Sequence, residues 1–370
     1  MKLNLTKRQK LFWSIWGTVL AVLLIALLTL ETVRQGIGGA LPDQCAADRW
    51  GGNSSQMSVF FDADRPYSVS SVQGVSHEIN ASLEDASLEA AGEGRLWYQA
   101  YSTERETYIE TERETFTVTA TLVGGDYFHI HVPMLVSGAP LGDGAAADGS
   151  VFMDEVTAFR LFGAVDVAGS TVKVADVSYT VSGVFRVPEN RFYDGYGDTP
   201  RIYLTYSSAF GRSVSDVSVW EAVLPEPVEG FAKGLVADIF GGYKDSAVTV
   251  ENSARFSIPA VWDLILRRDT LGVRTSSVTY PWFENVARVA EYKASSCLIA
   301  EAVLLAFVLV AVIVAIGGVW KPAERAIGRM TRAIIEKWND LWEYMTIPAV
   351  REAKKQRKRQ KRSFHKKETL

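Results

Sequence analysis

Two long apolar runs, separated by a region of shorter alternating segments, dominate the hydrophobic pattern of the chain. Residues 11–30 contain no charged side chain, and 20 residues in a helix rise about 30 Å, the thickness of a bilayer core. The second run, residues 298–320, contains one charged side chain, Glu301, which we expect to reach the outer membrane interface. We therefore predict two transmembrane helices. A cleaved signal peptide ending near residues 38–40 is the alternative for the first run, but its apolar part is normally about 7–15 residues long.

Short elements of both kinds fill residues 31–296, the region between the two runs. Strict alternation over residues 115–122 predicts a half-buried strand. Two further strands are predicted, at residues 57–61 and 96–101. Apolar residues recur at intervals of three and four in one predicted helix, at Val72, Val75, Ile79, Leu83 and Ala86. Later strands and helices follow without steady βα alternation. The sequence therefore predicts an α+β extracytoplasmic domain between two transmembrane α-helices.

The central segment, residues 122–186, has the most distinctive order of elements. A glycine turn at residues 124–126 precedes an aromatic pair, and a second break follows at a Ser-Gly pair. A short strand then leads to Asp154, a favourable N-cap, and to a helix that Gly163 ends. A β-hairpin with a loop at residues 175–178 closes the segment. The residues expected in the core of the domain are Phe116, Phe128, Phe159, Phe162, Val181 and Val184.

This order of strand, turn, strand, helix and hairpin resembles the MacB-like periplasmic core domain of ABC-transporter permeases. The residues that carry the resemblance are Gly124-Gly125-Asp126-Tyr127-Phe128, residues 135–138, Met153-Asp154-Glu155, Leu161-Phe162-Gly163 and residues 179–184. The resemblance implies a non-catalytic permease-type subunit that works with a separate ABC ATPase and relays conformational change through its ectodomain. Such permeases usually carry further spans, so we expect partner permease subunits to supply them. A membrane-anchored binding or scaffold protein of the cell surface, without ATPase coupling, is the alternative.

The two spans are expected to join the ectodomain differently. Several glycines and a proline after the first span predict a pliable link. No Gly or Pro interrupts residues 282–316, so we predict a continuous helix over residues 282–320. The part of this helix that precedes residue 298 would form a stalk outside the membrane, and Pro322 is expected to end the helix.

The charged residues are strongly segregated along the chain. Residues 1–10 carry four basic and no acidic groups, residues 31–296 have a net charge of −16, and residues 321–370 have a net charge of +9. Basic residues flank transmembrane segments on the cytoplasmic side, so we expect both termini in the cytoplasm and the acidic ectodomain outside the plasma membrane. The basic tail, residues 348–370, is expected to bind anionic lipids. Nucleic-acid binding is not expected beside a membrane span.

Residues 321–347, between the second span and the tail, predict an amphipathic cytoplasmic helix. Its apolar stripe contains Ile327, Ile334, Trp338 and Leu341. Such a helix either rests on the inner interface of the membrane or docks into a groove of an ATPase subunit. These four residues are therefore the predicted contact with the membrane or with a partner.

The chain contains no GxxxxGK[ST] loop, no GxSxG elbow and no HExxH helix, the motifs of common cofactor and catalytic sites. His129 and His131 would share one face of a strand, but no third ligand for a metal is apparent. We therefore predict no catalytic residue, no cofactor and no metal site. Cys45 and Cys297 would both lie outside the membrane and close to it, where they either form a disulfide or remain free.

Overall fold

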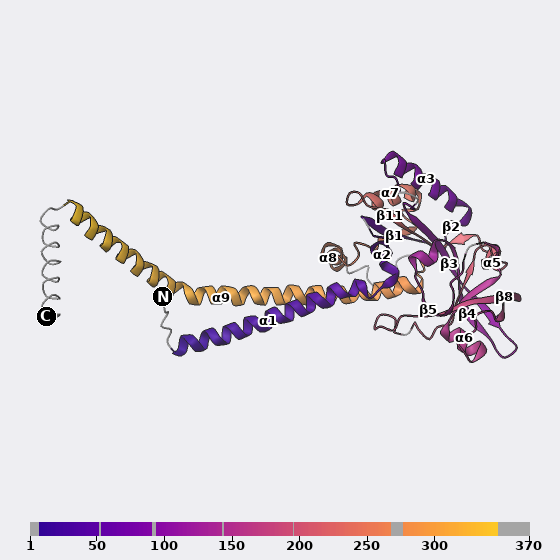
Figure 1. Cartoon of the computed structure of the whole chain (residues 1–370), viewed down its shortest axis with the longest axis horizontal. Coiled ribbons are helices and arrows are strands. Elements are labelled where there is room, and N and C mark those ends of the chain that lie inside the picture. Colours follow the sequence, from indigo (N-terminus) through magenta and orange to yellow (C-terminus); the bar gives the residue numbers. More distant parts are fainter. Residues whose placement is uncertain are drawn as a thin grey trace, which may run out of the picture. The chain divides into compact units, whose positions relative to one another are not determined.

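The computed structural model describes residues 7–51, 53–90, 94–142, 144–194, 196–267 and 277–346. It contains two compact units. One unit, residues 28–301, is a mixed α/β domain, and the other combines residues 1–27 with residues 302–370 (Figure 1). Two long helices, α1 (Lys7–Gly39) and α9 (Trp282–Thr346), contribute to both units.

Ten strands among the described residues form one mixed sheet in the order β12-β1-β11-β3-β4-β9-β6-β8-β5, with β7 beside β3 and β8. These strands are β1 (Ser54–Phe61), β3 (Tyr98–Glu110), β4 (Thr115–Gly125), β5 (Met134–Gly138), β6 (Ser150–Asp154), β7 (Thr171–Val174), β8 (Val177–Arg186), β9 (Arg201–Thr205), β11 (Val219–Pro225) and β12 (Ala247–Glu251). A separate pair is formed by β2 (Tyr67–Ser68) and β10 (Asp216–Val217). The pairs β4–β9 and β6–β8 are parallel, and the other pairs are antiparallel. The predicted α+β fold is confirmed.

Seven shorter helices accompany the sheet within the described residues. They are α2 (Ala46–Trp50), α3 (Val72–Asp85), α4 (Tyr127–Ile130), α5 (Ala145–Asp148), α6 (Glu155–Phe162), α7 (Phe231–Ile239) and α8 (Ile258–Leu266). The helix predicted from the apolar spacing after residue 72 is confirmed as α3. The predicted hairpin is confirmed as β7 and β8, but its turn is only Ala175 and Asp176, which both have positive φ as a two-residue type I′ turn requires.

The helices α3 and α7 cover one face of the first half of the sheet. Because side chains alternate along a strand, Met57, Val59 and Phe61 of β1 all point to this face. Trp220 of β11 is completely buried in the same cluster. The two helices add Val75, Ile79, Leu83, Ala232, Leu235 and Val236.

The opposite face of the sheet contacts the ends of the two long helices. Ile37 near the end of α1 and Leu41 just beyond it belong to one buried cluster with residues of α2, α4 and α9. The contribution of α9 to this cluster is Val286, Ala287, Ala290, Ala294 and Leu298. The core of the domain therefore includes parts of both long helices.

The prediction of a pliable link after the first span is wrong. α1 continues to Gly39, and a single 3-10 turn (Pro42–Gln44) and α2 follow directly. Gly38 lies against the ring of Phe256, since a Cβ on Gly38 would be 3.4 Å from Cδ2 of Phe256. A glycine costs a helix only about 1 kcal/mol relative to alanine, so tertiary contacts of this kind outweigh it.

The prediction that Pro322 ends the second helix is also wrong, because α9 is continuous over 65 residues. A proline removes one backbone hydrogen bond and crowds the preceding turn, but the turns on either side keep their own bonds. Ile334 and Trp338 are exposed on the last part of α9. The side chains of Ile327 and Leu341, and all of residues 347–370, lie outside the described part of the chain.

Both long helices are long and apolar enough to cross a membrane, over Lys10–Gly39 and Trp282–Gly317. The predicted spans, residues 11–30 and 298–320, therefore lie inside longer helices that extend into the domain. The part of α9 that precedes the predicted span is not a free stalk, since one of its faces is buried in the core of the domain.

The second half of the sheet is covered by α6, but through a different face of the helix from the predicted one. Asp154 caps the helix by accepting a hydrogen bond from the backbone N–H of Thr157 at 2.9 Å. Ala158 and Leu161 are completely buried, whereas Phe159 is 63% exposed. Phe116, Phe128 and Phe162 are only partly buried against their clusters, while Val181 and Val184 are in the core as predicted. The assignment of Phe159 to the core is wrong.

Leu161→Ala and Phe159→Ala give a matched test of this helix face. Removing the buried Leu161 side chain should lower the free energy of unfolding by at least about 2 kcal/mol, because it leaves a cavity. Removing the exposed Phe159 side chain should change it by less than about 0.5 kcal/mol. Urea unfolding of the two variants measures the difference, and equal losses would contradict the observed helix orientation.

Candidate functional site

Polar side chains line the face of the sheet that turns toward the long helices. Gln56 and Ser58 alternate along β1 with apolar residues that point the other way. Glu221, the only charged residue of β11, is directly opposite Ser58 in the strand register and is 2% exposed. A buried carboxylate is costly without a partner. This face of the sheet therefore requires a neutralising group.

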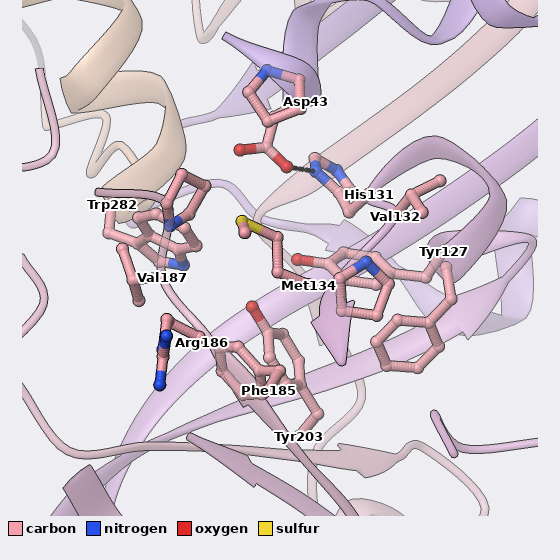
Figure 2. A pocket seen from close by; sticks show the side chains of 14 residues that line it. Asp43, Tyr127, His131, Val132, Met134, Phe185, Arg186, Val187, Tyr203 and Trp282 are labelled. Carbon is pink, nitrogen blue, oxygen red and sulfur yellow. Dashed lines mark hydrogen bonds and ion pairs between the residues drawn. The ribbon is translucent and has the colours of Figure 1, made fainter. Parts of the chain in front are cut away.

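His131 supplies that group. It follows α4 directly, and its Nε2 lies 2.5 Å from Oε2 of Glu221. Its Nδ1 lies 2.9 Å from Oδ1 of Asp43, which belongs to the single turn after α1 (Figure 2). One imidazole thus joins the sheet, the end of α4 and the segment that continues from the first long helix. We call Asp43, His131 and Glu221 the charged junction.

The remaining polar atoms of the charged junction are also bonded. Ser58 Oγ donates to Oε1 of Glu221 at 2.7 Å, and Nδ2 of Asn252 donates to Ser58 Oγ at 2.7 Å. Tyr193 donates its hydroxyl hydrogen to Oδ2 of Asp43 at 3.3 Å. A buried network with its members paired in this way holds one arrangement of the surrounding backbone.

The charged junction keeps His131 protonated. Burial alone would lower the pKa of His131, but the negative charge of Glu221 and the hydrogen bonds with Asp43 and Glu221 raise that pKa to about 10. The side chain is therefore an imidazolium between two carboxylates at neutral pH. With both ring nitrogens occupied, it can act neither as a general base nor as a metal ligand.

The first turn of α9 closes over the charged junction. The ring of Phe283 lies 4.4 Å from the imidazole of His131, and Tyr127 packs against the same imidazole at 4.5 Å between ring centroids. Trp282, the first residue of α9, lies under the guanidinium of Arg201 at 5.0 Å. The start of α9 is thus fixed by aromatic contacts to both α4 and the sheet.

A second buried charged cluster joins the segment after β12 to α9. The guanidinium of Arg255 donates two hydrogen bonds to Glu284, at 2.7 and 2.8 Å, and a third to Glu291 at 2.7 Å. The side chains of Arg255 and Glu284 are only 2% and 1% exposed. Glu284 also forms an ion pair with Arg288 one turn further along the helix, with Nε of Arg288 2.9 Å from Oε1 of Glu284. Bidentate geometry makes this a strong ionic contact between the segment after β12 and the helix.

A third charged contact joins the two long helices to each other. Nε of Arg34 in α1 lies 3.2 Å from both carboxylate oxygens of Glu301 in α9, and Nη2 of Arg34 lies 2.7 Å from Glu31. Glu301 is 8% exposed. Glu301 is therefore buried and paired, because α1 continues far enough for Arg34 to meet it.

A small cavity borders the charged junction. Figure 2 shows Asp43 and His131 at one side of it, with Tyr127, Phe185 and Tyr203 along the wall. Its volume is about 40 Å³, whereas pockets for small-molecule ligands usually measure about 300–1,000 Å³. The cavity is large enough for water but not for a substrate.

The structure separates residues that the sequence placed together. His129 and His131 do not share a strand face: His129 stacks on Tyr98 at the surface, and His131 is buried. Cys45 and Cys297 are both free, so the disulfide is not formed in this structure, and the thiol of Cys45 donates to the carbonyl of Gly38. Among the described residues, no group of three His, Cys, Asp or Glu side chains is arranged to hold a metal ion.

Sequence reasoning did not identify Asp43, Glu221 or Arg255. The available signal was a single charged residue inside an otherwise apolar strand, since β11 reads Val-Trp-Glu-Ala-Val-Leu-Pro. Such a residue indicates a buried partner elsewhere in the chain. The sequence did not identify that partner, because His131 and Glu221 are 90 residues apart.

Comparisons with known proteins found a matching family model and similar solved structures. The family model described as MacB-like periplasmic core domain matches residues 18–232. No curated protein matches the chain. Among solved structures, the periplasmic region of MacB from Actinobacillus actinomycetemcomitans is 15% identical, with a TM-score of 0.39 over 55% of this chain and 91% of that one. The extracellular domain of the noncanonic ABC-type transporter YknZ from Gram-positive bacteria is 14% identical, with a TM-score of 0.37 over 53% of this chain and 99% of that one.

Proposed function

Because the chain belongs to the family with a MacB-like periplasmic core domain, a permease-type component of ABC transporters, we propose that it is a non-catalytic relay subunit. In this proposal a separate ABC ATPase acts at the cytoplasmic side, and the ectodomain transmits its conformational change across the plasma membrane. Both termini are cytoplasmic. Partner permease subunits supply the further spans that such a complex needs.

One observation carries the proposal: both long helices are built into the core of the domain. α1 enters through Ile37 and the segment that carries Asp43, and α9 enters through Phe283 and Glu284. Ordinary membrane anchors need no such integration. A domain that shares its core with two helices must respond when either helix is displaced.

The charged contacts support transmission as a rigid body. Sliding α9 past the sheet would separate Arg255 from its two carboxylates and leave charges buried without partners, which costs several kcal/mol. The contact between Arg34 and Glu301 opposes sliding of α1 past α9 in the same way. Helices and sheet are therefore expected to move together, and a push on a helix reaches the sheet without being absorbed at a hinge.

The last part of α9 is the proposed contact with the ATPase. Met330, Ile334 and Trp338 are 58–63% exposed and recur at intervals of four. An apolar stripe with this spacing fits a helix that docks into a groove. Ile327 and Leu341 extend the stripe in the sequence, and the basic residues 348–370 would hold anionic lipids beside it.

The double substitution Ile334→Asp with Trp338→Asp tests this contact. Two carboxylates in an apolar groove should lower recovery of the ATPase subunit at least about tenfold when the chain is purified from detergent extracts. Membrane insertion should be unchanged, because both residues follow the apolar span. The matched control is Ala333→Asp with Asn339→Asp, which adds the same charge away from the stripe and should leave recovery intact.

The possible outcomes separate the two proposed roles. Equal recovery from the Ile334→Asp and Trp338→Asp variant would show that this helix is not the coupling element. If no ATPase subunit is co-purified with the unmodified chain, the relay proposal fails. The alternative of a membrane-anchored binding or scaffold protein would then be favoured.

A further inference from the structure

The helix α8 carries an exposed apolar stripe. Ile258, Trp262 and Leu266 are 53%, 47% and 71% exposed and recur every four residues, so they lie along one side of the helix. The adjacent side is turned inward, where Val261 is buried and Ile265 packs against the core. Single exposed apolar residues are common on protein surfaces, but a row of three large ones on a nine-residue helix is not.

Two consecutive residues before α8 fix its position on the long helices. Arg255 is bound to Glu284 and Glu291 of α9. Phe256 packs against Gly38 of α1. Ser257 then caps α8 by accepting a hydrogen bond from the backbone N–H of Ala260. The start of α8 is thus held between the two helices rather than on a free loop.

The inner side of α8 places it near the predicted membrane boundary. Val261 belongs to the buried cluster that contains Ile37 of α1 and Leu298 of α9. Leu298 is the first residue of the predicted second span, and Ile37 is two turns beyond the end of the first. Figure 1 shows α8 on the side of the domain where α1 and α9 leave it. The exposed stripe is therefore at the level of the headgroups if the two helices cross a bilayer.

We propose that α8 lies on the membrane, with Ile258, Trp262 and Leu266 in the interfacial layer of the leaflet on the side of the ectodomain. This inference rests on the proposed membrane-spanning role of α1 and α9. A tryptophan suits the headgroup layer because its ring is apolar and its N–H is polar. Asp263 of α8 and Arg267 just after it form an ion pair at 3.0 Å and lie on the other side of the stripe from Val261, where they can face water.

The chemistry of the stripe favours lipid over a protein partner. Short interfacial helices expose a few large apolar residues together with a tryptophan, and they bind lipid by burying their apolar side to a depth of about 5–10 Å. Membrane contact through α8 would fix the angle between the domain and the bilayer. A push along the long helices would then also press α8 against, or lift it from, the leaflet.

Spin-label accessibility in the full chain tests the proposal directly. The chain, with Cys45→Ser and Cys297→Ala, would be labelled singly at position 262 or 266 and placed in phosphatidylcholine nanodiscs. Both labels should collide several-fold more often with dissolved oxygen, which concentrates in lipid, than with a water-soluble nickel chelate. A label at position 159 is the matched control, because the exposure of Phe159, 63%, lies between those of Trp262 and Leu266, and Phe159 lies on α6.

The control at position 159 should show the reverse preference, for the nickel chelate. Water-like accessibility at positions 262 and 266 would overturn the proposal. Low accessibility to both reagents would overturn it as well, since a protein segment would then cover the stripe. A label at position 310 of α9 tests the membrane span itself. If position 310 contacts lipid but position 266 contacts water, only the role of α8 is refuted. If position 310 contacts water, the membrane span is refuted, and the proposed function with it.

Discussion

Replacing Arg255 by methionine should lower the free energy of unfolding by about 3–5 kcal/mol. The substitution leaves the carboxylates of Glu284 and Glu291 without their main partner, and the Glu284 side chain is 1% exposed. A charge in that position has no access to water that could replace the lost hydrogen bonds. Pulse proteolysis of the full chain in nanodiscs at increasing urea concentration measures the loss.

Two further variants show whether the loss comes from uncompensated charge. Arg267→Met removes an arginine from an exposed ion pair with Asp263, and should change stability by less than about 1 kcal/mol. Combining Arg255→Met with Glu284→Leu removes the most deeply buried carboxylate as well, and should recover part of the loss. If Arg255→Met alone costs less than about 1 kcal/mol, α9 is not held to the sheet by this cluster.

The alternation of apolar and polar residues was sufficient to predict β4, but not the second half of β3, which runs to Glu110 and not to residue 101. In β4, Val118, Ala120 and Leu122 are buried as the pattern indicated. The buried face of the two-turn helix α6 was harder to predict. Phe159 and Phe162 have helical spacing, and so do the smaller residues Ala158 and Leu161. Ala158 is small enough for the helix to approach the sheet, and this packing decides the face. A stripe over only eight residues does not contain that information.

The errors at Gly38 and Pro322 both began from local preference, and tertiary contacts explain the continuation of α1 only. Gly38 and Pro322 were treated as helix ends from their intrinsic preferences, which amount to about 1 and 3 kcal/mol. Contacts made by the same helices were not visible in the sequence, above all the ion pair between Arg34 and Glu301. Local preference predicts where a helix ends only if no tertiary contact extends it.

The charged junction could not be assembled from sequence spacing. Asp43, His131 and Glu221 come from three separate segments, and only Glu221, inside an apolar strand, stands out from its own surroundings. His131 was examined as a metal ligand together with His129, because a strand was expected there. The short helix α4 instead separates the two imidazoles and turns one of them into the core.

Stability of the domain should fall as the pH rises from 6.5 to 9, by about 3 kcal/mol over that interval. The pKa of His131 is about 10 in the folded chain, against 6.5 without the fold, so the folded state keeps a proton that the unfolded state loses. Stabilisation by the charged junction is therefore complete below pH 6.5 and is lost as the pH approaches 10. Urea unfolding of the full chain at pH 6, 7, 8 and 9 measures the slope.

Asp154 and Cys45 act mainly outside the chosen interval. Burial raises the pKa of Asp154 to about 6, so its contribution is lost between pH 3.8 and 6, below the interval. Burial also raises the pKa of the Cys45 thiol, and that group acts only from about pH 9 upward. His131→Gln should therefore be less stable at pH 6 and should lose most of the slope between pH 6.5 and 9. A slope that persists unchanged in this variant would mean that the imidazole between Asp43 and Glu221 is not held as a cation.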